Sequence, residues 1–149
     1  MRETFSIIPA PAVTAWFLGG MILLMASVLL LLGYIGWSSQ NVTYEVTLEG
    51  LCIRGDIYGR LVPLASLDLE RARLMDLTRE PEYRPKWRTN GTGLPGYAAG
   101  WFRLANREKC LAFLTDQRRA VYLPTRGGYS LLLSCADGEG LLRALKQRL

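Results

Sequence analysis

A short basic and aromatic segment near the middle of the chain carries the residues best suited to binding chemistry. It combines four cations with two aromatic residues and two acids: Arg79, Glu80, Glu82, Tyr83, Arg84, Lys86, Trp87 and Arg88. Arginine and lysine attract anionic groups, and amphipathic aromatic rings suit a wet surface. The segment therefore predicts a contact site for an anionic ligand or a partner. The alternative is a solvated loop in which the arginines pair with the two glutamates.

Further residues extend this predicted contact site beyond the basic segment. Asn90, Tyr97 and Trp101 follow it closely and offer one amide and two aromatic side chains. A second basic cluster is predicted from three arginines in neighbouring turns: Arg118, Arg119 and Arg126. Ordinary solvated turn residues are the alternative for this second cluster.

The residue types that most catalysis and metal binding require are missing or badly spaced. The chain has no histidine, which removes the commonest general base, the usual serine and cysteine triads and most zinc sites. Cys52, Cys110 and Cys135 are far apart and form no CxxC motif. We therefore expect no enzyme activity, no metal and no cofactor. The cysteines are expected to be buried thiols, with one disulfide plus one free thiol as the alternative.

The spacing Gly91-x-Gly93-x-x-Gly96 matches the dinucleotide-binding fingerprint, which functions only between a strand and the start of a helix. Pro95 and the surrounding glycines oppose a helix at this point. We instead expect residues 78–100 to form an ordered, turn-rich loop that packs on the domain through its aromatic residues.

The longest apolar stretch, residues 12–37, contains no charge and only Thr14 and Ser27 as polar interruptions. About 20 apolar residues cross the roughly 30 Å hydrocarbon core, so the stretch predicts a transmembrane helix in contact with the lipid bilayer. Trp16 and Trp37 are about 32 Å apart along a helix and are expected to anchor the two interfaces. A helix in a soluble core would alternate polar and apolar faces, and a cleavable signal peptide would have a shorter apolar region.

The regions on either side of this stretch set the expected topology. Residues 1–11 form an N-terminal tail, residues 38–41 a short linker, and residues 42–149 the domain. Four extended residues reach about 14 Å, which keeps the domain close to the headgroups. The tail carries Arg2, whereas residues 38–53 contain no Lys or Arg. The positive-inside rule therefore weakly favours a cytoplasmic N-terminus and a domain outside the membrane. The odd number of cysteines favours the opposite topology, with the domain on the reducing, cytoplasmic side.

The domain has the sequence pattern of short antiparallel strands followed by one helix. Period-two alternation and turn residues predict strands at 42–49, 51–54, 57–62, about 71–77, 101–105, 109–114, 120–123 and 129–133. Ser134 is predicted to cap the final helix, with an apolar stripe of Leu141, Leu142, Leu145 and Leu149. Seven to eight strands favour a small, mainly-β barrel that the C-terminal helix caps.

This order of elements resembles the bacterial pleckstrin-homology (PH)-like domains. The resemblance rests on the hairpin at residues 44–55, on the RTNGTGLPGY sequence at 88–97, and on the LLSCAD sequence before the helix. It covers residues 42–149, and the second sequence is similar to a membrane-anchored subgroup. The resemblance implies a seven-stranded PH-like barrel with a capping helix, no catalysis, and a place in the bacterial inner membrane. The eukaryotic phosphoinositide site is not carried over, because Glu45 and Glu49 stand in the first hairpin.

The expected function is a membrane-anchored interaction module that binds a protein partner at the membrane surface. One alternative is binding of anionic lipid headgroups through the basic loop 79–88. A second is an accessory subunit of a membrane protein complex. The formal net charge of +5 alone does not select nucleic acid, and the anchor argues against it.

Overall fold

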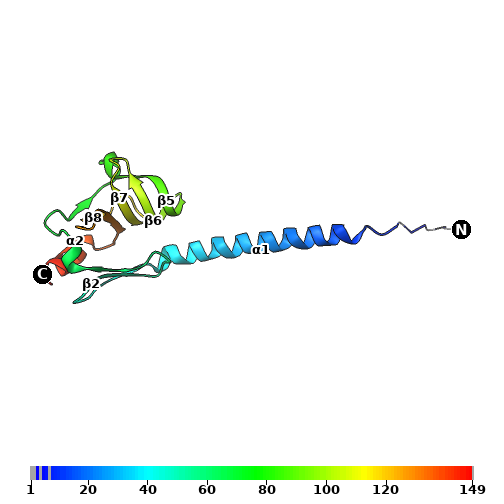
Figure 1. The fold of residues 1–149 in the computed structure, drawn as a ribbon, viewed down its shortest axis with the longest axis horizontal. Helices are drawn as coiled ribbons and strands as arrows, with labels where there is room; N and C mark the ends of the chain where they lie inside the picture. The colour runs from blue at the N-terminus through cyan, green and yellow to red at the C-terminus, as the bar shows by residue number, and fades with distance from the viewer. Residues whose placement is uncertain (1–2, 4, 7, 149) are drawn as a thin grey trace. The chain divides into compact units, whose positions relative to one another are not determined.

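The computed structural model describes residues 3, 5–6 and 8–148, and the chain divides into two compact units, Met1–Trp37 and Ser38–Leu149. The first unit contains most of helix α1 (Ala12–Asn41), shown in Figure 1. Among the described residues, α1 is the helix long and apolar enough to cross a membrane, and none of that apolar window is buried. Trp16 and Trp37 both lie on this helix with exposed side chains.

The helix does not end where the sequence predicted a linker. Residues 38–41 form its last turn rather than an extended connection. No glycine or proline interrupts this stretch, and the Ser38 hydroxyl donates hydrogen bonds to the Gly55 carbonyl (3.0 Å) and to Asp56 Oδ2 (2.7 Å). Ser38 is therefore buried within the second unit, and the expected linker is part of the domain.

The domain begins with a small antiparallel sheet in the order β1-β2-β3. Its strands are β1 (Thr43–Val46), β2 (Gly50–Arg54) and β3 (Leu61–Pro63). The predicted first hairpin is confirmed, whereas the third strand starts later than expected because residues 57–60 lie in the preceding turn. A 3₁₀ turn, η1 (Leu64–Ser66), follows.

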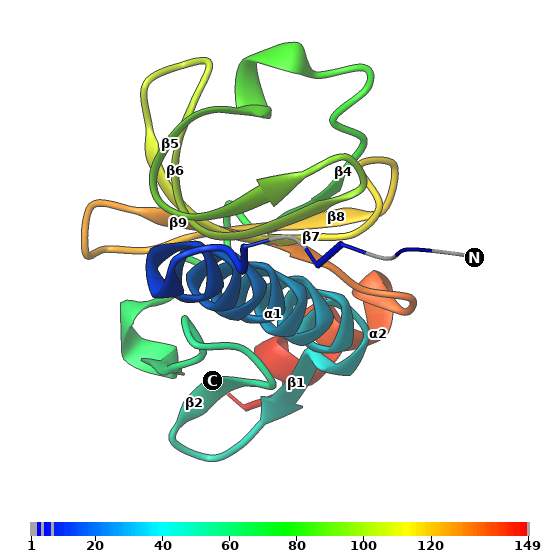
Figure 2. The same ribbon diagram turned by 90° about the vertical axis from the view of Figure 1, so that its right-hand side faces the viewer.

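A larger sheet contains the remaining six strands in the order β4-β8-β9-β7-β6-β5. They are β4 (Arg73–Met75), β5 (Pro85–Leu94), β6 (Tyr97–Leu104), β7 (Lys109–Leu114), β8 (Ala120–Pro124) and β9 (Ser130–Ser134), with a 3₁₀ turn, η2 (Pro81–Tyr83), before β5. All neighbours pair antiparallel except β7 and β9, which are parallel. The mainly antiparallel fold with a C-terminal helix is confirmed, but the two sheets form layers rather than one closed barrel (Figure 2).

The expected loop at 78–100 is mostly a long hairpin, and this prediction was wrong. Strand β5 has no fully buried residue, so neither of its faces carries the apolar alternation that reveals a strand in sequence. Pro95 and Gly96 turn the chain into β6, and Gly96 adopts φ 78°. Proline followed by a residue with positive φ is the signature of a type II turn.

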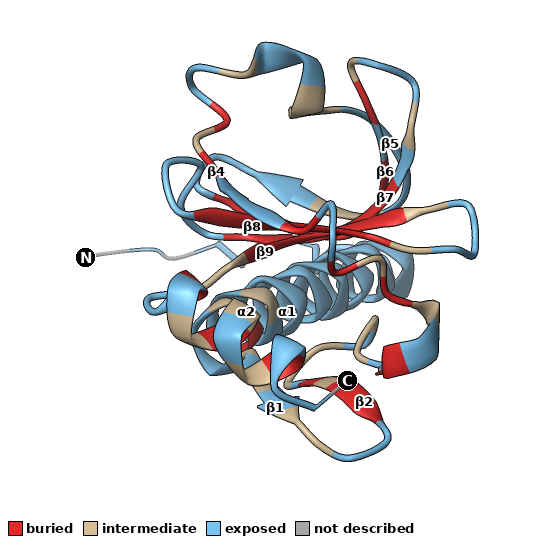
Figure 3. Ribbon diagram, turned by 90° about the vertical axis from the view of Figure 1, so that its left-hand side faces the viewer, coloured by how far each residue is buried: buried red, intermediate tan, exposed pale blue. Residues whose placement is uncertain are grey.

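Both faces of the larger sheet are buried along its central strands (Figure 3). One face contributes a core cluster: Met75, Leu77, Phe102, Leu104, Cys110, Ala112, Leu114, Ala120, Tyr122 and Leu132. Leu111 and Phe113 alternate with that set in β7, and Leu131 and Leu133 do so in β9. Burial on both faces explains why β9 is a nearly continuous apolar run.

Helix α2 (Gly138–Lys146) contacts β1 and β4, one strand from each sheet. Its cap is Asp137, whose Oδ1 accepts a hydrogen bond from the Gly140 amide (2.8 Å). The predicted cap, Ser134, instead ends β9, where its hydroxyl accepts hydrogen bonds from the amides of Thr115 and Asp116. Leu141 and Leu145 of the predicted stripe are buried, and Leu149 lies outside the described residues.

Gly138 permits the close approach of α2 to the larger sheet, and this gives a first prediction. A Cβ atom at this position would lie 2.5 Å from Leu74 Cδ2 and 2.8 Å from Val121 Cγ2. We expect Gly138→Ala to lower the free energy of unfolding by about 1–2 kcal/mol, because overpacking outweighs the gain in helix propensity. Denaturant unfolding of the full chain in mild detergent measures this. The exposed neighbour substitution Glu139→Ala is the control, and an equal effect of both changes would contradict the packing argument.

Candidate functional site

A partly exposed aromatic ring with two cations stacked on it forms a distinctive polar surface of the domain. The Trp101 ring centroid lies 4.9 Å from Arg60 Cζ and 4.6 Å from Lys109 Nζ. The Tyr129 ring meets Trp101 edge-on at 5.2 Å between centroids. We call Arg60, Trp101, Lys109 and Tyr129 the Trp101 cluster.

Strand register explains how these residues come together. Trp101 and Arg103 occupy alternate positions of β6 and so project from the same face of the sheet. Arg103 lies opposite Lys109 in β7, and Asn90 of β5 lies opposite Trp101. A shallow depression of about 330 Å³ is lined by Thr89, Asn90, Trp101, Arg103 and Lys109.

The cations of this surface have no acidic partner among the described residues. The ion pairs there are Arg54 with Glu45, Arg73 with Glu80, and Arg79 with Asp76, none of which includes Arg60, Arg103 or Lys109. Cations stacked on aromatic rings are held in place while their charge stays available, at about 0.5–1 kcal/mol per exposed contact. The surface is therefore suited to an anionic group that the chain does not itself supply.

The predicted basic segment is only partly available for such a contact. Arg79 pairs with Asp76 at 3.7 Å, and hydrogen bonds from Thr78 hold the pKa of that carboxyl below its usual value. Arg84 donates to the backbone carbonyls of Leu77 (2.5 Å) and Thr78 (3.2 Å), so it ties the start of β5 to the preceding turn. The structure therefore does not bring Arg79 and Arg84 to the Trp101 cluster.

The other members of the segment belong to β5. The Lys86 ammonium lies 4.6 Å from the centre of the Trp87 ring, and both side chains are exposed. Arg88 lies opposite Phe102, whereas Asn90 lies opposite Trp101 on the other face of the hairpin. Asn90 also accepts a hydrogen bond from the Tyr58 hydroxyl (3.1 Å).

Tyr97, predicted as a ligand contact, has a structural role. It is buried, and its hydroxyl donates to Asp56 Oδ2 at 2.7 Å. Asp56 also accepts from the Ser38 hydroxyl (2.7 Å) and from the Tyr58 amide (3.0 Å). We call Ser38, Asp56 and Tyr97 the Asp56 junction. The sequence analysis missed it because one acidic residue in a polar turn gives no periodic signal.

Arg60 and Lys109 were also missed as site residues. Both are single cations in turn or strand-end positions, where solvated charge is the usual interpretation. Lys109 contacts Trp101 across the β6–β7 hairpin, and Arg60 contacts it from the loop that precedes β3.

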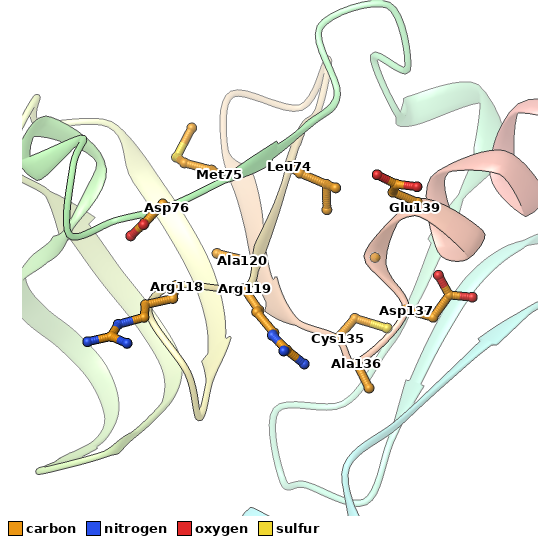
Figure 4. A pocket seen from close by; sticks show the side chains of 11 residues that line it. Leu74, Met75, Asp76, Arg118, Arg119, Ala120, Cys135, Ala136, Asp137 and Glu139 are labelled. Atoms are coloured by element: carbon orange, nitrogen blue, oxygen red, sulfur yellow. The ribbon is translucent and has the colours of Figure 1, made fainter.

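The predicted second basic cluster is divided between the two ends of β8. Arg118 and Arg119 precede this strand and line a depression of about 450 Å³ (Figure 4). The same depression contains Asp76, Asp137 and Glu139, so its charge is mixed rather than uniformly positive. Arg126 follows β8, and its amide donates to the Ser66 carbonyl. The structure does not bring Arg126 together with the other two arginines.

Buried titratable side chains stay protonated at neutral pH. Burial raises the pKa of Cys110 and of Tyr44, and burial together with a hydrogen bond to Glu108 raises the pKa of Tyr122. The three cysteines are free, with Cys110 buried and Cys52 and Cys135 partly exposed. Among the described residues, no group of three or more acids and cysteines is placed to bind a metal.

A comparison with known families identifies the family to which the domain belongs. A sequence model of the family described as bacterial PH domain matches residues 42–149. This match covers well over half of the chain, so the chain belongs to the bacterial PH domain family. Searches among curated proteins and among solved structures find no match.

The Asp56 junction provides a second prediction. We expect Tyr97→Phe to lower the free energy of unfolding by about 1.5–3 kcal/mol, because a buried hydroxyl that donates to a carboxylate is lost. Denaturant unfolding of the full chain in detergent measures the change. The control is Tyr58→Phe, which removes an exposed hydrogen bond and should cost less than about 0.5 kcal/mol. Equal losses would show that the junction contributes nothing special.

Proposed function

We propose that the chain is a membrane-anchored, non-catalytic interaction module that binds an extended, acidic segment of a partner protein along β5. The observation that carries this proposal is the open edge of the larger sheet. Strand β5 is the last strand in the sheet order, so no strand of the described residues pairs with its outer side. It is also ten residues long, whereas the strand at the other edge, β4, has three.

Helix α1 supports the membrane anchor. It is apolar throughout the predicted span, and it carries Trp16 and Trp37 at the expected spacing. A signal sequence passes the same test of length and composition near an N-terminus. We favour an uncleaved anchor because Ser38, the residue after Trp37, is part of the domain's hydrogen-bond network. The proposed location is the bacterial inner membrane. That the domain faces outward stays a prediction, and Arg2, on which it depends, lies outside the described residues.

The turn-proximal half of β5 presents an accessible backbone. A two-residue turn closes on a hydrogen-bonded pair, here Leu94 with Tyr97, and pair types then alternate along the hairpin. Gly91 and Gly93 accordingly direct their backbone groups outward, and they carry no side chain to obstruct a new strand. Extended peptides bind exposed sheet edges in this way, with backbone hydrogen bonds providing affinity.

The other half of β5 selects against self-association and for an acidic partner. Register shifts between Pro85 and Trp87 and between Arg88 and Asn90 interrupt regular pairing. Bulges and edge cations are devices that discourage sheets from pairing with copies of themselves. Lys86 and Arg88 would repel a second β5 but attract carboxylates. Arg103 on the adjacent strand β6 and Lys109 on β7 add cations that have no acidic partner among the described residues.

The alternative of anionic lipid binding through loop 79–88 has less support in the geometry. Two of its four cations, Arg79 and Arg84, already have partners within the domain. If the chain is instead an accessory subunit of a membrane complex, it would use the same β5 edge. The contact would then be permanent rather than transient. No feature of the described surface favours nucleic acid over an acidic protein segment.

A matched pair of substitutions at Gly93 tests the proposal. Proline has no backbone N–H, so Gly93→Pro removes the amide that points outward. No hydrogen bond to β6 is lost, because the Gly93–Ala98 pair is not a hydrogen-bonded pair. Gly93→Ala keeps the amide, and its Cβ would lie at an ordinary 3.7 Å from Phe102 Cε1. We expect a partner to be recovered with the Ala form and reduced at least about tenfold with the Pro form, which corresponds to losing about 1.4 kcal/mol of binding. The measurement is quantitative mass spectrometry after chemical cross-linking and purification in mild detergent.

Two results would contradict this function. A partner recovered equally with both forms would show that the β5 edge is not the binding surface. Recovery of no protein above the level found with an unrelated single-helix anchor would show that the domain binds no protein partner.

A further inference from the structure

A small pocket lies beside the turn end of the β5–β6 hairpin. Gly93 of β5 is paired with Ala98 of β6, and neither residue has a side chain that extends beyond Cβ. A Cβ atom at Gly93 would lie 3.7 Å from Phe102 Cε1 and 3.9 Å from Phe102 Cζ, so position 93 faces the side of the sheet that carries the core cluster. The pocket has a volume of about 280 Å³, and its lining includes Arg84, Gly93, Leu94, Ala98, Phe102 and Leu114. We call it the Gly93 pocket.

The apolar part of this lining belongs to the core of the domain. Phe102 and Leu114 are buried members of the core cluster, and Ala98 packs against that cluster. Leu94 lines the same pocket and is 45% exposed. Pockets that enclose drug-sized ligands measure about 300–1,000 Å³. The Gly93 pocket is slightly smaller than this range, so it suits one large side chain rather than a cofactor.

The charge of the lining is positive and comes from one residue. Arg84 is the charged residue among those that line the pocket, and no acid lines it. Arg84 Nε and Nη2 donate hydrogen bonds to the backbone carbonyls of Leu77 and Thr78, which hold the guanidinium in place without neutralising its charge. Arg84 takes part in no ion pair among the described residues. The pocket therefore complements an apolar group that has a carboxylate beside it.

A strand paired with the outer edge of β5 would bring a side chain to this pocket. Residues directly opposite each other in neighbouring strands project from the same face, with Cβ atoms about 4.5–5.5 Å apart. The residue opposite Gly93 would therefore project on the side that carries Phe102, where Gly93 itself leaves space. An aromatic side chain can cover a glycine of the adjacent strand in this way. When peptides add a strand to a sheet, such pockets provide the specificity.

We infer that the Gly93 pocket selects the partner segment by accepting one aromatic or large aliphatic side chain, from the residue that pairs with Gly93, while Arg84 binds a neighbouring carboxylate. The inference rests on the proposed binding along β5, and it names the side chains that the partner must carry. The ligand class is an extended protein segment with an apolar residue beside Asp or Glu.

Selection from a displayed library of random ten-residue segments tests the inference on the full chain in lipid nanodiscs. Empty nanodiscs first remove the segments that bind lipid. The native chain, Gly93→Pro, Ala98→Leu and Ala98→Ser are then used in parallel. Ala98→Leu fills the pocket from β6 and leaves the backbone of β5 unchanged, and Ala98→Ser is the matched control that keeps the pocket open.

The native chain is expected to select segments in which a large apolar residue has an acid within two positions. A synthetic peptide of the selected sequence should bind Ala98→Leu at least about tenfold more weakly than it binds the native chain or Ala98→Ser, because burial of one large apolar side chain contributes this much affinity. Leu94→Ser removes an exposed part of the pocket wall and should weaken binding in the same direction. If Ala98→Leu does not fold, Leu94→Ser decides the test.

The variants separate failure of this inference from failure of the proposed function. Binding that is lost in Gly93→Pro but unchanged in Ala98→Leu and Leu94→Ser would overturn the role of the pocket and leave the β5 edge as the binding surface. Selection of acidic segments without a large apolar residue would overturn it in the same way. Binding that is unchanged in Gly93→Pro would contradict pairing along β5, and the inference with it. Selection of no segment by the native chain would contradict both.

Discussion

The Asp56 carboxylate is the interaction on which the arrangement of this domain depends most. It accepts hydrogen bonds from the Ser38 hydroxyl, the Tyr58 amide and the Tyr97 hydroxyl. These donors come from the end of α1, the β2–β3 loop and the start of β6. Hydrogen bonds to a charged, partly buried group are stronger than neutral ones, and removing a donor leaves the charge under-solvated. One side chain thus joins the end of α1, the β2–β3 loop and the start of β6.

The binding surfaces follow from this junction and from the two-layer sandwich. Tyr97 fixes where β6 starts, and four residues later the same strand presents Trp101 to Arg60, which lies at the end of the β2–β3 loop. The apolar residues of the larger sheet concentrate in its central strands, which are buried on both faces. Strand β5 lies at the end of the sheet order, and its outer edge is open. The bacterial PH domain thereby presents a long edge strand and cations that have no acidic partner among the described residues.

The sequence predicts the parts of this fold that carry a strong pattern and misses those that depend on distant pairing. The apolar run at 12–37 and strands such as β7 were predictable because burial imposes composition or alternation on them. Strand β5 was not, since an exposed edge needs no apolar face. The Asp56 junction was invisible because its partners lie 18 and 41 residues away in the chain. The loop 79–88 attracted attention for its charge, whereas the structure uses Arg84 to bind backbone carbonyls.

The central claim is that residues 38–41 are a helical turn held by Asp56 rather than a flexible linker, and hydrogen exchange tests it most directly. Exchange is followed by mass spectrometry on the full chain in nanodiscs, for the native protein and for Asp56→Ala. The account predicts that amides of residues 38–41 and 54–60 exchange at least about 100-fold more slowly than in an unstructured peptide, and that Asp56→Ala removes most of this protection. Exchange of residues 38–41 at the unstructured rate in the native chain, or unchanged protection in Asp56→Ala, would contradict it.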